Sequence, residues 1–251
     1  MRSPAVVRSW SLAYVVLVVG HLAALAAGVD PVADVTQSLF APVLAATLVV
    51  ATRWPRGHVV SWTLAALVGS FLGDTVPRFV GGDASFLVMV GCFLVAQVCY
   101  VVAFAVRSRR SVLRRAPGWL VPYAAVLAAL VGLCAPHAGT LLVPVAVYGG
   151  VLTAMAVLAT GLGRLGAVGG AVFLVSDALI AVERFVPGWD LPGQGLWVMA
   201  TYAAGQALLV VAVTRDNRAR RRARPVVRAT ASAPRRDNVV ALVAARGHLG
   251  V

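Results

Sequence analysis

The sequence predicts an all-α membrane protein, a bundle of eight transmembrane helices with both termini in the cytoplasm. Of its 251 residues, 60% are hydrophobic and only 12% are charged, whereas about a quarter of the residues in an ordinary soluble domain are charged. Eight apolar segments are each long enough to span a bilayer, and nearly all arginines fall on alternate connections between them. Composition, segment length and charge placement therefore all predict a polytopic membrane protein.

The eight predicted helices are defined by length, because about 20 apolar residues are needed to cross a bilayer. The segments that meet this requirement are roughly 9–28, 33–52, 59–77, 84–106, 118–135, 139–160, 165–184 and 195–213. The first follows a basic start and ends in alanines, as a signal peptide does. Its charge pattern fits the other segments, so we expect it to be retained as the first helix.

Orientation follows from the arginines, because cytoplasmic loops of membrane proteins carry an excess of positive charge. All 22 basic residues are arginine. Alternate connections place Arg78 and Arg184 on one side and the remaining 20 (22 minus 2) on the other. We therefore expect both termini on the cytoplasmic side of a bacterial plasma membrane, with the ends of segments 59–77 and 165–184 facing outward.

The composition changes at Thr214, where a basic tail follows the last apolar segment. We expect a transmembrane domain at 1–213 and a disordered cytoplasmic tail at 214–251 that lies near anionic lipid headgroups. A dedicated partner for the tail is the alternative. The net charge of +13 would suggest nucleic acid in a soluble protein, but arginines in short loops are explained by topology, so we expect no nucleic-acid binding. The sequence does not indicate an oligomeric state.

The two halves of the chain share a pattern. The third segment ends in "GDTVPRFV" and the seventh in "SDALIAVERFV", and the segments that follow them carry Gln97 and Gln206. Because the third and seventh segments run in the same direction, this pattern predicts a parallel four-plus-four repeat. Chance similarity between helices rich in Ala, Val and Leu is the other explanation, and both stay open.

Two aspartates lie within predicted membrane helices. An ionisable side chain there costs on the order of 3 kcal/mol and therefore suggests a function. At about 1.5 Å per residue, Asp177 lies roughly 10 Å from the boundary marked by Arg184, and Asp74 lies about 6 Å from Arg78. We expect the two acids to share one cavity. For Asp74, a position at the water interface or a pair with Arg78 is the alternative.

Other polar side chains are candidates for substrate binding near these acids. Interhelical hydrogen bonding is the alternative role for the amides and phenols among them. The sequence has no serine-hydrolase, zinc-protease or phosphate-loop motif and no metal-ligand spacing of His and Cys, so we expect neither a metal nor a cofactor. The candidate binding residues are Arg78, Gln97, Tyr100, Tyr148, Ser176, Arg184, Tyr202 and Gln206.

Several stretches together resemble the YhhN or lysoplasmalogenase-like family of eight-span membrane proteins. The similarity covers nearly all of residues 30–213 through "LFAPVLAATL", "FLGD", "FLVAQVCYVVAF", "GAVGGAVFLVSDALIA" and "TYAAGQALLV". Each stretch alone is weakly specific, but their order and spacing together are fairly specific. The resemblance implies the fold predicted above and hydrolysis of the vinyl-ether bond of lysoplasmalogens, which yields a fatty aldehyde and a glycerophospho head group.

This implied reaction needs one protonated and one ionised carboxyl group. A proton must reach the alkenyl carbon to form an oxocarbenium ion, which water then attacks. We expect the deeper Asp177 to be the acid and Asp74, near Arg78, to be the base or the group that stabilises the oxocarbenium ion. Either Arg78 or Arg184 is then placed to meet the phosphate of a lysolipid.

The chain departs from the family pattern at two positions. It has Ala41-Pro42 where the family usually has Lys-Pro, and Gln97 where the family usually has a histidine. These differences remove a charge and a titratable group. A non-catalytic membrane protein that binds or transports a lipid or small solute is therefore the alternative function, and a purely structural role for the acids is a third.

Overall fold

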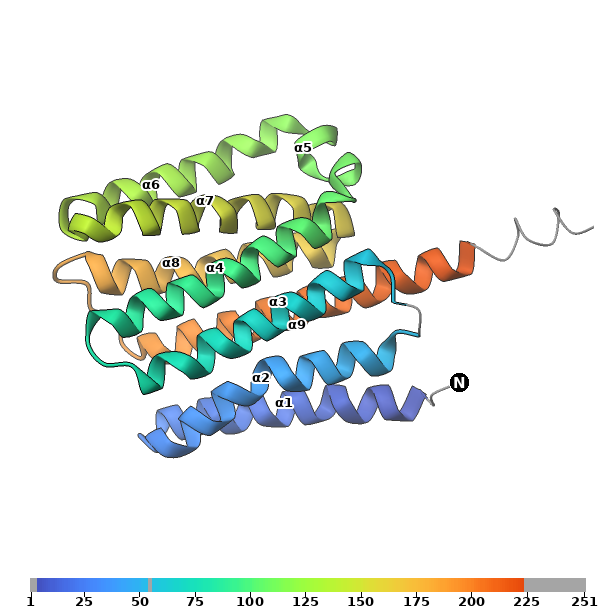
Figure 1. The fold of residues 1–251 in the computed structure, drawn as a ribbon, viewed down its shortest axis with the longest axis horizontal. Helices are drawn as coiled ribbons and strands as arrows, with labels where there is room; N and C mark the ends of the chain where they lie inside the picture. Colours follow the sequence, from blue (N-terminus) through green and yellow to red (C-terminus); the bar gives the residue numbers. More distant parts are fainter. Residues whose placement is uncertain (1–3, 54–55, 224–251) are drawn as a thin grey trace, which may run out of the picture. The chain divides into compact units, whose positions relative to one another are not determined.

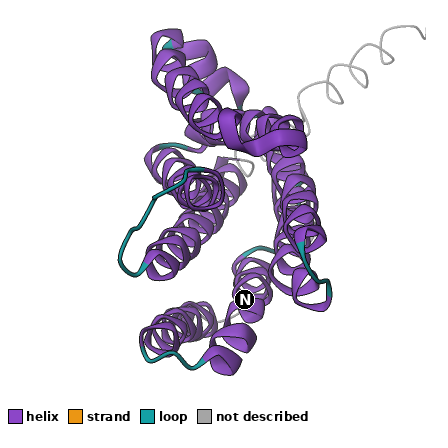
Figure 2. Ribbon diagram, turned by 90° about the vertical axis from the view of Figure 1, so that its left-hand side faces the viewer, coloured by secondary structure: helices purple, strands orange, loops and turns teal. Residues whose placement is uncertain are grey.

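The computed structural model describes residues 4–53 and 56–223, and every regular element in these ranges is helical (Figure 1; Figure 2). Short helical turns occupy several connections, among them α5 (Val112–Arg115) and the 3-10 helix η1 (Val76–Phe79). The long helices are α1 (Pro4–Ala26), α2 (Asp30–Ala51), α3 (His58–Thr75), α4 (Asp83–Ala105), α6 (Leu120–Ala138), α7 (Leu142–Ala159), α8 (Arg164–Phe185) and α9 (Gln194–Ala223).

The predicted membrane helices are confirmed in number and type. Within residues 4–53 and 56–223, seven stretches are long and apolar enough to cross a membrane, and one of them, Pro117–Leu162, has 46 residues. This long stretch contains two helices, α6 and α7, because the chain reverses at Gly139, whose φ of +51° is accessible to glycine at little cost. Eight helices of membrane-spanning length therefore form the bundle, as predicted.

Consecutive long helices alternate in direction (Figure 1). One end of the bundle, called here the arginine-rich end, holds residues 52–53 and 56–57, the segment 106–119 with its five arginines, and the turn 160–163. The exposed Asp30, Asp34 and Asp190 lie at the other, called here the acidic end. Helices α3 and α8 both finish at the acidic end. The side of the membrane that each end faces, and the four-plus-four repeat, stay predictions.

Helix α9 joins the two halves of the bundle through buried polar contacts. On the α1 side, the Tyr14 hydroxyl donates to the Ala203 carbonyl at 2.9 Å. On the α3 side, the Gln206 amide donates to Ser70 Oγ at 2.9 Å. On the α4 side, the Tyr100 hydroxyl donates to Gln206 Oε1 at 2.5 Å. These bonds fix α9 between helices that precede it by more than 100 residues.

Glycines allow α8 to approach its neighbours closely. A Cβ added at Gly170 would lie 2.9 Å from the Ala156 Cα of α7, and one added at Gly169 would lie 2.9 Å from Leu208 Cβ of α9. Close approach of small residues is a common way to pack membrane helices. In this protein it fixes the segment of α8 that leads into Asp177.

The last helix is longer than the predicted membrane segment. Helix α9 continues to Ala223, ten residues past the expected end at 213. Near the arginine-rich end, Asp216 forms a buried ion pair with Arg107 at 2.5 Å. The compact unit that holds the site is Met1–Asn217. Residues 224–251 lie outside the described residues, so the predicted disordered tail stays a prediction.

Replacing Gly205 by alanine should destabilise the bundle. A Cβ at this position would lie 2.9 Å from the backbone nitrogen of Phe173 on α8, and overpacking of this kind costs roughly 1–3 kcal/mol. The matched control is Gly132→Ala on the exposed side of α6, where nothing lies within 4 Å. Chemical denaturation in detergent should show a lower free energy of unfolding for Gly205→Ala alone. Equal values for both variants would contradict this packing.

Cysteine labelling should establish the orientation in the membrane. In a variant without the native cysteines, we expect a membrane-impermeant maleimide added to intact cells to label Asp190→Cys at the acidic end and not Arg109→Cys at the arginine-rich end. Both positions are exposed, and the excess of arginine predicts that the second lies in the cytoplasm. Labelling of Arg109→Cys alone would reverse the orientation.

Candidate functional site

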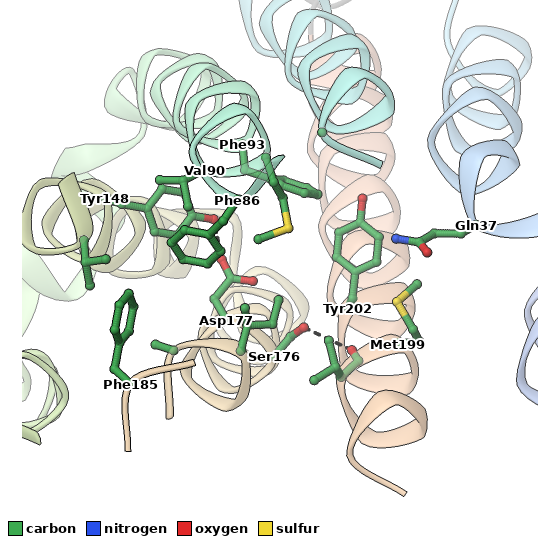
Figure 3. A pocket seen from close by; sticks show the side chains of 16 residues that line it. Gln37, Phe86, Val90, Phe93, Tyr148, Ser176, Asp177, Phe185, Met199 and Tyr202 are labelled. Atoms are coloured by element: carbon green, nitrogen blue, oxygen red, sulfur yellow. Dashed lines mark hydrogen bonds between the residues drawn. The ribbon is translucent and has the colours of Figure 1, made fainter. Parts of the chain in front are cut away.

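A cavity of about 150 Å³ lies among helices α2, α3, α4, α7, α8 and α9, toward the acidic end. Most of its lining is apolar, including the aromatic side chains of Phe86 and Phe93 from α4 (Figure 3). A mainly apolar cavity with a few converging polar groups is the usual form of a ligand site. The polar side chains that line it are Gln37, Tyr148, Ser176, Asp177 and Tyr202.

Asp177 faces this cavity directly. Its carboxylate Oδ2 accepts a hydrogen bond from the Tyr148 hydroxyl of α7 (Figure 3). Its neighbour Ser176 donates to the Val198 carbonyl of α9 at 3.0 Å, which ties α8 to α9 beside the acid (Figure 3). The carboxyl group is thus held by one phenol and remains open to a molecule in the cavity.

Asp74 lies behind the cavity wall. Its side chain is only 4% exposed, and it is not among the residues that line the cavity. Tyr202 donates to Asp74 Oδ2 at 2.7 Å and Gln37 Nε2 donates to Oδ1 at 3.0 Å. Asp74 therefore does not sit at the water interface, and it meets the cavity only through Tyr202 and Gln37.

Arg78 contacts one partner of Asp74, Gln37, and not Asp74 itself. Its guanidinium donates to Gln37 Oε1 at 3.1 Å and to the Asp34 carbonyl, and it pairs with the Asp34 carboxylate at 3.5 Å. It also donates to Ser38 Oγ at 2.9 Å. A direct pair between Arg78 and Asp74 is therefore absent in the structure. The Gln37 amide connects the two, with its oxygen toward the arginine and its nitrogen toward the acid.

The network continues inward from Tyr202. Gln206 Nε2 lies 3.5 Å from the Tyr202 hydroxyl and 2.9 Å from Ser70 Oγ, and Gln206 Oε1 accepts from Tyr100. All four side chains are buried. Tyr100 and Gln206, both expected to bind substrate, are instead placed deeper in the bundle, where they fix the position of Tyr202.

Aromatic rings hold Tyr202 on its other sides. The centroids of the Phe173 and Phe93 rings lie 5.6 Å and 5.8 Å from that of Tyr202, both in edge-to-face geometry. Phe40 lies 6.4 Å away. Such pairs stabilise a buried ring beyond its area alone. The orientation of the Tyr202 hydroxyl is therefore determined by packing as well as by hydrogen bonds.

Arg184 lies at the mouth of the cavity. Its guanidinium carbon is 5.4 Å from the centroid of the Phe86 ring, within the range of a cation–π contact. A shallow hollow lined by Gly82, Ser85, Phe86, Met89 and Arg184 adjoins the cavity and shares Phe86 and Met89 with it. An exposed cation therefore lies where the cavity opens toward the acidic end.

The two positions at which the chain departs from the family pattern are both buried. Ala41 is 2% exposed in the hydrophobic core, one turn along α2 from Gln37. Gln97 is fully buried, and neither atom of its amide has a hydrogen-bond partner among the described residues. This amide lies beside the Tyr148 hydroxyl but does not line the cavity, in contrast to its expected role in binding.

The structure brings together much of the predicted site. The predicted binding residues Tyr148, Ser176 and Tyr202 line the same cavity as Asp177, the predicted acid. Gln37 was missed by the sequence analysis, although an amide within an apolar segment is the same signal that identified Gln97. No group of three or more His, Cys, Asp or Glu side chains suited to a metal is found in the described ranges.

The arrangement offers two routes for proton transfer between a molecule in the cavity and a carboxyl group. A molecule in the cavity meets the Asp177 carboxyl directly. On another wall it meets the Tyr202 hydroxyl, whose hydrogen bond leads to Asp74. Groups at hydrogen-bonding distance can act as general acid and general base. The site therefore offers one carboxyl for direct transfer and a second that acts through a phenol.

Comparisons with known proteins identify similar chains. Residues 35–213 match the YhhN family. Two curated relatives, each named lysoplasmalogenase, come from Mycobacterium bovis and Mycobacterium tuberculosis. Each is 30% identical over 220 residues, a region that covers 81% of this chain and 81% of the relative. No solved structure matches the chain.

Removing the Tyr202 hydroxyl should weaken the fold. In Tyr202→Phe, Asp74 Oδ2 loses the donor at 2.7 Å, and an unsatisfied buried polar group costs about 1–3 kcal/mol. The control is Tyr123→Phe, since Tyr123 is a half-buried tyrosine of α6 outside the cavity lining. The free energy of unfolding in detergent should fall for Tyr202→Phe and stay near the wild-type value for Tyr123→Phe. Equal losses of unfolding free energy would show that the hydrogen bond to Asp74 contributes no more to stability than the Tyr123 hydroxyl does.

Proposed function

Because the chain belongs to the YhhN family, we propose that it is a membrane-embedded lysoplasmalogenase, which hydrolyses the vinyl-ether bond of a lysoplasmalogen. The products are a fatty aldehyde and a glycerophospho head group. The names of its mycobacterial relatives support this proposal. The observation that carries it is the position of Asp177, a carboxyl held by Tyr148 at the wall of an apolar cavity inside a membrane bundle.

Asp177 is the proton donor in the proposed reaction. Its carboxylic acid transfers a proton to the second alkenyl carbon, which turns the double bond into an oxocarbenium ion at the carbon attached to oxygen. Water adds to that carbon and loses a proton, which gives a hemiacetal. The hemiacetal then breaks its bond to the glycerol oxygen, which takes up a proton, and the aldehyde leaves. One water is consumed. Its first proton passes to the second carboxyl, Asp74, which later gives a proton to the departing glycerol oxygen. Its second proton leaves the hemiacetal hydroxyl as the aldehyde forms and restores the acid of Asp177.

Asp74 is the second carboxyl of the proposed reaction and acts through Tyr202. The attacking water gives its proton to the Tyr202 oxygen as the phenol passes its own proton to Asp74 Oδ2. The 2.7 Å bond between these two groups supports this route. Gln37 and Arg78 keep the Asp74 carboxylate oriented toward Tyr202, since the Gln37 amide bonds to both.

Arg184 is the residue that meets the phosphate of the head group. It lies beside the hollow that adjoins the cavity, at the end of the bundle where a lipid head group reaches the membrane surface. Arg78 is less suited, because it does not line this hollow. With both termini in the cytoplasm, this head-group site faces outward across a bacterial plasma membrane.

Aldehyde release from a lysoplasmalogen by the detergent-purified protein tests the proposal. Asp177→Asn should lower kcat by about 10²–10⁴, the usual contribution of a general acid, and should leave substrate binding measurable. Asp190→Asn is the control, because Asp190 is an exposed acid at the same end of the bundle and its loss should not change the rate.

The same assay separates the proposal from its alternative. A folded wild type that binds lysolipid and releases no aldehyde would exclude the hydrolase and favour a lipid-binding or lipid-transporting protein. Full activity in Asp177→Asn would keep the hydrolase but remove Asp177 from the chemistry. Asp74→Asn should also lose turnover, with binding retained, because the water then lacks its final proton acceptor.

A further inference from the structure

A second pocket lies on the other side of the Tyr148–Asp177 pair. It runs along the seam between α6, α7 and α8, has a volume of about 50 Å³, and is called here the seam pocket. It shares Val145, Tyr148, Asp177 and Ala181 with the main cavity. The Tyr148–Asp177 pair is therefore a common wall with a pocket on each side.

The two pockets differ in chemistry. The main cavity has Gln37, Ser176 and Tyr202 in its wall and opens toward Arg184. Apart from the shared pair, the seam pocket has Thr153 as its polar lining residue, and the rest is aliphatic side chains, Gly149 and Cys134. A ligand that occupies both pockets would have a polar part on one side of Asp177 and a hydrocarbon part on the other.

The seam pocket points from the site toward the middle of the bundle. Its α6 wall extends from Cys134, near the acidic end, to Leu127, a distance of about 10 Å at 1.5 Å per residue. A lipid whose head group lies at the acidic end also directs its chain toward the middle of the bundle, because the chain extends into the hydrocarbon layer, which is about 30 Å thick. The Leu127 side chain lies over Gly149, where an added Cβ would be 3.0 Å from Leu127 Cδ1. The small Gly149 therefore keeps this part of the seam pocket wall free of a side chain from α7.

We propose that the seam pocket binds the hydrocarbon chain of the lysolipid substrate next to the reacting bond, and that it sets the preference for chain length. The proposal rests on the function proposed above. In this arrangement the glycerophospho part lies in the main cavity and the vinyl ether crosses the wall at Asp177. The bond to be cleaved is then beside the proton donor because the two pockets meet there.

Filling the seam pocket should change chain-length preference. Ala178 of α8 lines the seam pocket and not the main cavity. In Ala178→Leu, kcat/KM for a hexadecenyl lysoplasmalogen should fall at least about tenfold relative to that for a propenyl one, whose chain is too short to enter the seam pocket. This change is equivalent to the burial of roughly two methylene groups. Ala128→Leu, on the exposed face of α6, is the matched control and should leave this ratio unchanged. Thr153→Leu is a second filler should Ala178→Leu fail to fold.

A binding measurement tests the pocket without turnover. The probe is a non-cleavable alkyl lysophospholipid with a diazirine at the end of its chain, applied to the full chain in detergent. We expect labelling of α6 between Leu127 and Cys134 that excess unlabelled lysolipid suppresses and that Ala178→Leu abolishes. Suppressible labelling confined to helices other than α6, α7 and α8 would overturn the proposal.

The two experiments separate this proposal from the proposed function. Seam labelling by a wild type that releases no aldehyde would leave the chain site in place and remove the hydrolase. Aldehyde release with an unchanged chain-length ratio in both Ala178→Leu and Thr153→Leu would overturn the chain site and leave the hydrolase.

Discussion

The structure depends on the hydrogen bonds that two tyrosines give to two acids inside the bundle. A carboxyl group among membrane helices is costly unless polar partners surround it. Tyr148 of α7 supplies the partner for Asp177, and Tyr202 of α9 supplies one for Asp74. Each of these hydrogen bonds joins two different helices. The register between α3 and α9, and that between α7 and α8, must therefore stay fixed. The glycine contacts of α8 and the aromatic rings around Tyr202 help to hold that register.

The two acids differ in what they can meet, and the proposed chemistry follows from that difference. Asp177 lies between two pockets, so a substrate that passes from one to the other presents its bond to this carboxyl. Asp74 is shielded by Tyr202 and Gln37 and is linked through Gln37 to the exposed Arg78. One carboxyl is thus accessible, and the other is oriented by a polar network that reaches the acidic end.

The number of helices and the presence of both acids within the bundle could be predicted from the sequence, because apolar length and intramembrane charge are local signals. The partners of the acids could not, since Tyr202 and Asp74 are 128 residues apart. Counting residues from a boundary placed Asp177 deeper along its helix, but burial also depends on which face of a helix carries the side chain, and Asp74 is the more buried acid. Likewise, the apolar segment ends at residue 213, whereas helix α9 continues to Ala223. The helix continues because arginine favours helices and because Asp216 pairs with Arg107.

The most direct test of this account is the reaction of the folded protein with a hydrophobic carbodiimide, followed by identification of the modified carboxyl groups. The reagent reaches carboxyl groups through apolar pockets. The account predicts modification of Asp177, protection of Asp177 by a non-cleavable lysolipid, and little modification of Asp74 unless Tyr202 is replaced by a smaller residue. Modification of Asp74 in preference to Asp177, or modification of Asp177 that lysolipid does not reduce, would contradict it.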